Sequence, residues 1–220
     1  MGIRAVAFDL DYTLAVPDRD RETILSEAVE ATGAPRLTRE EYLAAHSDNL
    51  TEETREPVFE ALLADRETDT PACDVARAYR ERVTDALVPV PGVEGLLSEL
   101  RGTYRLGLLT NGPTVAQREK LRVLGWTEAF DVALVSGELA AGKPDRAAFA
   151  ALVEALGVEP GETVFVGDRV GDDVGGAAAA GLLPIQVLYP GGPDPDERAV
   201  AHVQREDLVA RLPELLRELG

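Results

Sequence analysis

The sequence predicts an α/β protein in which helices cover both faces of a parallel β-sheet, with a helical domain inserted after the first strand. Three observations lead to this prediction. Short, near-continuous apolar segments, typical of buried parallel strands, alternate with segments of helical periodicity. The first four apolar segments end at or beside Gly, Asp, Asn or Ser, and one long stretch contains no convincing strand. This pattern is typical of a Rossmann-like, doubly wound sheet.

The elements of the sheet domain are expected in alternating order. Apolar runs, most of them rich in Val, Leu or Ile, predict strands at residues 3–10, 105–110, 132–136, 163–167 and 184–188. Helical periodicity predicts helices at residues 93–100, 114–124, 146–156, 174–180 and 206–219. Because proline lacks a backbone N–H, we expect a kink or a restart in the last helix near Pro213.

Residues 18–87 break this alternation and contain helical segments instead. Helices are predicted at residues 22–32, 39–46, 52–63 and 72–86, and Thr38 with Glu41 fits a capping box at the start of the second. We therefore expect a helical domain at residues 17–88, inserted at the carboxyl edge of the sheet. Residues 1–16 and 89–220 would form the sheet domain.

The composition describes a folded chain with an unusual charge. Hydrophobic residues make up 45% of the 220 residues, and the longest uncharged stretch, residues 174–193, is broken by Gly and Pro. A membrane-spanning helix is therefore not expected. The net charge of −18 would repel a nucleic-acid backbone, so we expect no nucleic-acid partner. A single cysteine, Cys73, favours a reducing, cytoplasmic location.

The acidic residues are spread along the whole chain, which indicates a general surface property. Of the 22 basic residues, only Lys120 and Lys143 are lysines. We interpret the excess acid as adaptation to a salty cytoplasm, where salt screens the repulsion between like charges. An arginine-biased genome would explain the arginines but not the excess acid.

Asp9 and Asp11 form the acidic pair with the most informative position. With 17 Asp in 220 residues, roughly one such pair is expected by chance, and the sequence has three, so spacing alone carries little weight. Only this pair closes a buried strand, at the edge where open α/β sheets bind ligands. Two such carboxylates could hold a divalent cation or divide the roles of nucleophile and acid–base.

Four motifs in this order resemble the haloacid dehalogenase superfamily of hydrolases. Asp9-Leu10-Asp11-Tyr12-Thr13 resembles its first motif, and Thr110-Asn111 its second. Lys143-Pro144-Asp145 resembles the third, and Gly167-Asp168 followed by Asp172 and Asp173 resembles the fourth. The resemblance covers almost the whole chain, from residue 3 to about residue 188, and residues 17–88 lie where the family carries its helical cap.

The resemblance implies a phosphatase that works through an aspartyl-phosphate intermediate. It assigns the nucleophile to Asp9 and the acid–base to Asp11, which would protonate the leaving alcohol and then activate water. Thr110, Asn111 and Lys143 would bind the substrate, with Thr110 and Lys143 holding the phosphoryl oxygens.

The resemblance also implies Mg²⁺, held by Asp9, the backbone carbonyl of Asp11, and Asp168. Asp172 or Asp173 would support the cation or Lys143 from behind, and Thr13 is placed with them as a supporting residue. We favour Asp173 for this supporting role, because the Gly176-Ala177 that follows it matches the commoner form of the family's fourth motif.

Other functions with similar parts stay open to different degrees. A dehalogenase has no alcohol to protonate, so Asp11 favours phosphoryl transfer. A phosphosugar mutase uses the same parts and a similar cap. A signalling receiver domain also combines an acidic pair, a phosphorylated Asp, a Thr and a Lys, but in another order and without a long insert.

The substrate is expected to be a small phosphorylated metabolite that the cap selects. Arg19, Arg36 and Arg55 are candidate cap contacts that the sequence does not rank. Lys120 lies in a helical charge pattern, and we expect it at the surface together with His46.

Overall fold

The computed structural model describes residues 2–47, 49 and 52–220 and contains a six-stranded parallel sheet. The strand order is β5-β4-β1-β6-β7-β8, so β1 lies near the centre. The strands are β1 (Ala5–Phe8), β4 (Arg105–Thr110), β5 (Val132–Val135), β6 (Thr163–Gly167), β7 (Leu183–Leu188) and β8 (Ala201–Gln204). The five predicted strands are confirmed within a few residues at their ends.

The sequence analysis missed β8, the edge strand beside β7. Its sequence, Ala-His-Val-Gln, has a single fully buried residue, Val203, so no apolar run marks it. A half-exposed edge strand carries a weaker hydrophobic signal than a central one.

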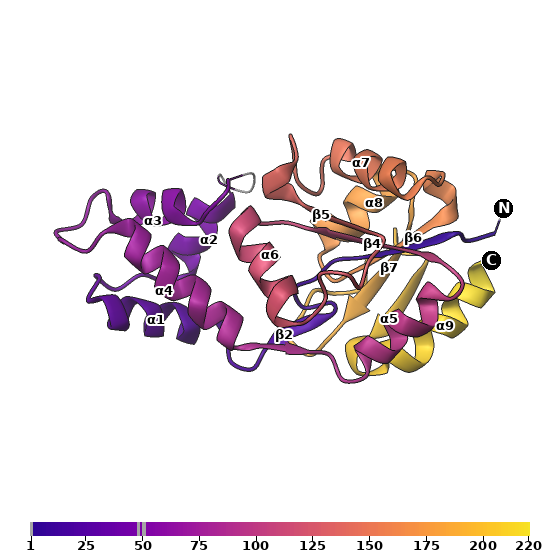
Figure 1. Ribbon diagram of the computed structural model, residues 1–220, viewed down its shortest axis with the longest axis horizontal. Coiled ribbons are helices and arrows are strands. Elements are labelled where there is room, and N and C mark those ends of the chain that lie inside the picture. The colour runs from indigo at the N-terminus through magenta and orange to yellow at the C-terminus, as the bar shows by residue number, and fades with distance from the viewer. Residues whose placement is uncertain (1, 48, 50–51) are drawn as a thin grey trace.

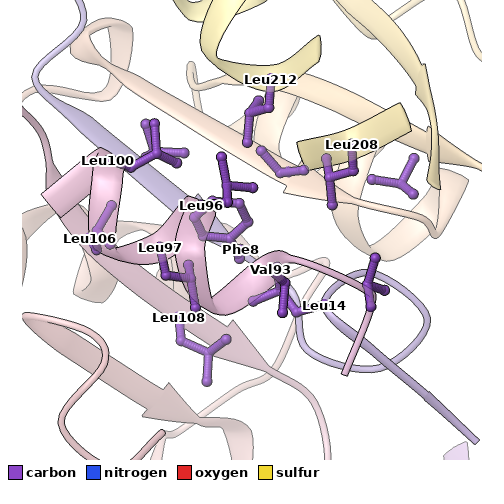
Figure 2. Packing of buried hydrophobic residues seen from close by; sticks show 14 of the residues in the cluster. Phe8, Leu14, Val93, Leu96, Leu97, Leu100, Leu106, Leu108, Leu208 and Leu212 are labelled. Carbon is purple, nitrogen blue, oxygen red and sulfur yellow. The ribbon is translucent and has the colours of Figure 1, made fainter. Parts of the chain in front are cut away.

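Helices cover both faces of the sheet, as predicted (Figure 1). The helices of the sheet domain are α5 (Val93–Arg101), α6 (Thr114–Val123), α7 (Arg146–Leu156), α8 (Gly176–Ala179) and α9 (Leu208–Leu219). Side chains of α5 and α9 pack on Phe8 and Leu108 at one face (Figure 2). Phe149 of α7 packs on Phe165 at the other face, with ring centroids 5.2 Å apart. Burial of these apolar side chains is the main force that holds the two helical layers to the sheet.

Two of the predicted helices differ in the structure. The helix expected at 174–180 is a short α8 that follows one wide, π-helical turn at Val170–Gly175. The glycines at 171, 175 and 176 disfavour a longer regular helix. The last helix begins at Leu208, after a 3₁₀ turn at Arg205–Asp207, and runs continuously through Pro213 without a restart.

The insert is a group of four helices with its own hydrophobic core. They are α1 (Arg21–Thr32), α2 (Arg39–Ser47), α3 (Glu56–Leu63) and α4 (Ala72–Asp85). α3 begins four residues later than expected, with Pro57 in its first turn. The predicted capping box is present, since Thr38 N donates to Glu41 Oε2 (2.8 Å) and Glu41 N donates to Thr38 Oγ1 (3.2 Å). Buried side chains of all four helices form one cluster.

The insert joins the sheet domain through two antiparallel strands, β2 (Ala15–Pro17) and β3 (Leu87–Pro89). The residues before α3 also meet the start of α6, the helix that lies between the insert and the sheet in Figure 1. Thr114 N donates to the carbonyl of Glu52 (3.3 Å) and Val115 N to that of Glu53 (3.0 Å). These bonds satisfy amide groups that the first turn of a helix leaves free. None of the helices in the described residues has the length and hydrophobicity of a membrane span.

Candidate active site

The predicted site residues meet at the carboxyl edge of the three central strands. Asp9 follows β1, Thr110 ends β4 and Asp168 follows β6. β1 pairs with both β4 and β6, and Asp9 N also donates to the carbonyl of Val166 (2.9 Å). Because parallel strands end at one edge, residues more than 150 positions apart become neighbours.

Lys143 lies between two of these carboxylates. Its Nζ is 2.7 Å from Oδ1 of Asp9 and 2.6 Å from Oδ1 of Asp173, and all three residues are buried. Burial lowers the pKa of Lys143, but Asp173 and Asp9 outweigh this effect and hold the pKa above its usual value. Burial raises the pKa of Asp9, and the ammonium group opposes this rise. Lys143 therefore stays charged beside the predicted nucleophile.

Asp173 and Asp172 have different partners in the structure. Besides Lys143, Asp173 accepts a hydrogen bond from Arg169 N (2.9 Å), and a Cβ at Gly167 would lie 2.5 Å from its Cγ, so only glycine leaves room for it. Asp172 pairs with Arg169 Nε (2.9 Å) away from Lys143, and its carboxylate is partly exposed. Of the two, Asp173 is therefore the one that contacts Lys143.

Asp9, Asp168 and Asp173 form an acidic group that suits a hard cation. Each offers a carboxylate oxygen within 4.8 Å of the others. Asp168 Oδ2 accepts a hydrogen bond from the hydroxyl of Tyr189 (3.0 Å), whereas its Oδ1 is buried without a partner among the described residues. Burial, reinforced by Asp173, raises the pKa of Asp168 to about 7. An unpartnered buried acceptor beside two more carboxylates fits the oxygen ligands that Mg²⁺ prefers.

The carboxylate of Asp11 is bonded to side chains outside this acidic group. Oδ2 lies 2.5 Å from Lys120 Nζ and 3.2 Å from Gln117 Nε2, and Oδ1 lies 2.9 Å from Arg21 Nη2. Burial raises the pKa of Asp11, but Lys120 and Arg21 outweigh it and hold the pKa well below its usual value. The side chain is therefore oriented by three donors, two of them cationic. This arrangement is compatible with the implication of the resemblance that Asp11 binds a cation through its backbone carbonyl and not through its carboxylate.

The expectation that Lys120 is a surface residue is wrong. Its side chain is 3% exposed, and burial lowers its pKa to about 8, with Asp11 opposing the shift. The charged neighbours Arg118 and Glu119 suggested a solvated face, but Lys120 shares the inward face of α6 with Ala116, Gln117 and Leu121. The spacing of Ala116 and Lys120, four positions apart, is the signal that could have placed it inward.

Thr110 and Asn111 connect the site to α6 and to Lys143. Gln117 Nε2 donates to Thr110 Oγ1 (2.6 Å) and to Asn111 O (2.8 Å). Asn111 bonds the backbone of Lys143 twice, through Nδ2 to its carbonyl (2.7 Å) and through Oδ1 from its N–H (2.9 Å). Asn111 thus fixes the segment that carries the lysine. Thr13 is fully buried, and its Oγ1 has no partner among the described residues.

Three residues at the site carry no local sequence signal. Arg21 begins α1 and reaches back to Asp11, and Gln117 bridges Asp11 and Thr110. Tyr189, beyond β7, donates to Asp168 and stacks on Tyr12 with ring centroids 5.8 Å apart. Tyr12 has a left-handed backbone (φ 64°) in the turn after β1.

Comparisons with known proteins agree with this geometry. A family model described as haloacid dehalogenase-like hydrolase matches residues 3–181. The glyceraldehyde 3-phosphate phosphatase of Methanopyrus kandleri is 33% identical over 196 residues, which are 84% of each chain. Among solved structures, a 2-haloacid dehalogenase from Pseudomonas syringae has a TM-score of 0.73 and 26% identity, covering 99% of this chain and 100% of its own.

A HAD phosphatase from Thermococcus onnurineus has a TM-score of 0.69 and 26% identity, covering 97% of this chain and 98% of its own. Dehalogenases and phosphatases therefore share this architecture, and the likeness in fold does not separate them. The family match extends over all four motifs, from the strand that precedes Asp9 to the turn that carries Asp173. The chain belongs to the haloacid dehalogenase-like hydrolases.

Proposed function

We propose that the chain is a Mg²⁺-dependent phosphatase that hydrolyses a small phosphorylated metabolite through an aspartyl phosphate on Asp9. The observation that carries this proposal is the position of Lys143 between Asp9 and Asp173, beside the unpartnered Oδ1 of Asp168. The arrangement offers a carboxylate nucleophile, a fixed positive charge for phosphoryl oxygens and donors for a cation. The activity named for the Methanopyrus kandleri relative, on a three-carbon phosphate ester, supports the same class of reaction.

In the first half of the reaction, a carboxylate oxygen of Asp9 bonds to phosphorus and the bond to the ester oxygen breaks. The leaving alkoxide takes its proton from Asp11. In the second half, Asp11 accepts a proton from water, whose oxygen bonds to phosphorus and releases inorganic phosphate and the free Asp9 carboxylate. Lys143 and the Thr110 hydroxyl would hold the phosphoryl oxygens during both halves.

The Mg²⁺ would be held by Asp9, Asp168 and the carbonyl of Asp11, with Asp173 beside them. When bound, it supplies positive charge that reduces the repulsion between Asp9 and an anionic phosphate. Asp11 is already a carboxylate in the protein alone, which suits its role as base. The nearby charge of a bound phosphate would raise its pKa and favour the protonated form that the acid role requires.

We assign the helical insert, residues 17–88, to the role of the cap that selects the substrate, and we place the protein in the cytoplasm. The insert contributes Arg21 to the bonds around Asp11, which puts it on the leaving-group side of the site. A phosphosugar mutase would use the same residues, and phosphate release separates the two activities.

The test is hydrolysis of an aryl phosphate by the whole chain, with and without exhaustive chelation, followed by titration with Mg²⁺. We expect activity only with Mg²⁺ or a similar hard cation, and Asp168→Asn should need a higher Mg²⁺ concentration for half-maximal activity or lose activity altogether. The matched control is Asp194→Asn, which alters an exposed acid outside the site. Undiminished activity after chelation would remove the metal assignment, and absence of phosphate release with every ester would remove the proposed function.

A further inference from the structure

Tyr189 bonds the acidic group from outside the four motifs. It follows β7, and its hydroxyl donates to Oδ2 of Asp168 (3.0 Å). A tyrosine hydroxyl keeps its proton at neutral pH, so toward a carboxylate it acts as the donor. This bond occupies Oδ2. Oδ1 of Asp168, which is buried without a partner among the described residues, is then the oxygen that is free to bind a cation.

The ring of Tyr189 is held by several neighbours, which fixes the place of its hydroxyl. The ring of Tyr12 stacks on it, with centroids 5.8 Å apart and an angle of 18° between the planes. The guanidinium of Arg205 lies 4.3 Å from its centroid. A Cβ at Gly192 would lie 2.8 Å from Cε2 of the ring, so a side chain at that position would push the ring away. A ring packed in this way keeps its hydroxyl directed at Asp168.

The same contacts reach the turn that carries Asp11. Nη1 of Arg205 donates to the carbonyl of Tyr12 (3.3 Å), and Tyr12 has the left-handed backbone of that turn. The carbonyl of Asp11, the residue before Tyr12, is one of the proposed cation ligands. Tyr189 therefore contacts both segments that would supply ligands beside Asp9, the turn after β1 and the residue that follows β6.

Asp168 depends on this hydroxyl more than its neighbours depend on theirs. Lys143 bonds both Asp9 and Asp173, and Asp173 also accepts a bond from the backbone of Arg169. For the Asp168 side chain, Tyr189 is the one hydrogen-bond donor among the described residues. A neutral donor suits this position, because a second ammonium or guanidinium group in contact with Asp168 would repel a cation bound there.

We propose that Tyr189 is a positioning residue for the cation, whose hydroxyl holds Oδ2 of Asp168 so that Oδ1 is presented to Mg²⁺ together with Asp9. This inference rests on the proposed function, and within it on the Mg²⁺ site. A group that bonds a metal ligand from behind orients that ligand, and its loss commonly weakens metal binding by about 10- to 100-fold.

The test measures the affinity for a hard cation directly, with Mn²⁺ as the probe and the signal of free Mn²⁺ in electron paramagnetic resonance as the readout. Tyr189→Phe removes the hydroxyl and keeps a ring beside Tyr12 and Arg205. We expect its Kd for Mn²⁺ to rise about tenfold or more. Without added cation, its melting temperature should stay within about 3 °C of that of the unmodified chain.

Tyr104→Phe is the matched control, because Tyr104 precedes β4 at the amino edge of the sheet, at the far end from the site. It also loses one tyrosine hydroxyl, and its Kd for Mn²⁺ should stay within about twofold of that of the unmodified chain.

Hydrolysis of an aryl phosphate gives a second readout. Tyr189→Phe should need about tenfold more Mg²⁺ for its half-maximal rate. At saturating Mg²⁺, its kcat and its KM for the ester should stay within about threefold of the values for the unmodified chain, because the hydroxyl acts on the cation ligand and not on the ester.

Four results would contradict these expectations. An unchanged Kd for Mn²⁺ in Tyr189→Phe would overturn the inference. Weaker binding in Tyr189→Leu but not in Tyr189→Phe would overturn it too, since the ring and not the hydroxyl would then be responsible. A raised KM at saturating Mg²⁺ with an unchanged Kd would make Tyr189 a substrate contact instead. Absence of Mn²⁺ binding to the unmodified chain would overturn the cation assignment and this inference together.

Failure of the phosphatase function gives a different result. If Mn²⁺ binding weakened in Tyr189→Phe as expected but the unmodified chain released no phosphate from any ester, the proposed reaction would be wrong. The role of Tyr189 at the cation site would then stand.

Discussion

Nζ of Lys120 lies 2.5 Å from Oδ2 of Asp11, although the two residues are 109 positions apart in the sequence. Lys120 is nearly fully buried, and Asp11 is partly open to solvent. The lysine thus reaches Asp11 from inside the protein and leaves part of the carboxylate free. In the proposed reaction, this contact orients the group that transfers the proton.

Replacement of Lys120 by Met should impair the steps that depend on the orientation of Asp11. We expect kcat for an alkyl phosphate to fall about 10- to 100-fold, with a smaller loss for an aryl phosphate, whose leaving group needs little protonation. Lys120→Arg should recover part of the loss. Steady-state kinetics with both esters measures the effect.

Arg122→Met is the matched control, because Arg122 lies on the same helix with its side chain 70% exposed. An equal loss with both esters would contradict the positioning role of Lys120 and indicate a purely structural one.

Asp9→Asn and Asp11→Asn should fail in different ways. Asp9→Asn removes the nucleophilic carboxylate, so no phosphoenzyme should form. Asp11→Asn removes only the proton-transfer group, a role worth roughly 10²- to 10⁴-fold. With an aryl phosphate this variant should accumulate phosphate on Asp9 and release a small burst of phenol, and with an alkyl phosphate the burst should vanish. Rapid-quench kinetics with intact-mass detection measures both species.

If Asp11→Asn slowed both steps equally with both leaving groups and no phosphoenzyme could be trapped, Asp11 would be a structural residue or a metal ligand. The proposed division of roles between Asp9 and Asp11 would then be wrong.

His46, which the sequence analysis expects at the surface, is partly buried, with its Nδ1 buried and its ring stacked on Tyr42, and this should make the protein less stable in mild acid. Its pKa is lowered from 6.5 to about 3 in the folded protein, so the unfolded chain binds the proton more readily below pH 6.5. Stability therefore falls as the pH drops from 6.5 towards 3, by about 2 kcal/mol from this group at pH 5. His46→Phe keeps a ring to stack on Tyr42 and should remove this part of the pH dependence.

Urea unfolding at pH 7 and pH 5 measures the difference between the two chains. His202→Phe, which alters an exposed histidine, is the control. An unchanged pH dependence in His46→Phe would show that the imidazole becomes protonated without cost in the folded state.

Added KCl should stabilise the protein up to molar concentrations. The excess of acidic side chains gives a net charge of −18, and these side chains repel one another in dilute buffer. At 1 M salt the screening length is only about 3 Å, so this repulsion becomes weak. The melting temperature should rise with KCl more than that of a neutral control protein. A melting temperature that stays flat or falls would count against adaptation to a salty cytoplasm.

The sequence was most informative where the chemistry sits at strand ends. Asp9, Thr110 and Asp168 each end an apolar run, and parallel pairing alone brings them together. The sequence analysis placed Lys120 at the surface because its charged neighbours, Arg118 and Glu119, suggest an exposed helix face, although Lys120 itself lies on the buried face of α6. The sequence did not identify Arg21 as a site residue and did not rank Arg55 among the candidate arginines. The surroundings of both residues depend on how the insert packs on α6. β8 was missed because an edge strand with one fully buried residue carries little hydrophobic signal.

The pairing of β2 with β3 makes the chain leave the sheet domain and return to it at neighbouring positions. The insert, residues 18–86, therefore closes like a loop whose two ends lie side by side, and the β2–β3 pairing holds these ends together whatever lies between them. The four insert helices also keep their own apolar cluster, apart from those on the sheet. Substitutions inside the insert can thus accumulate while the strand ends that carry Asp9 and Asp168 stay in register.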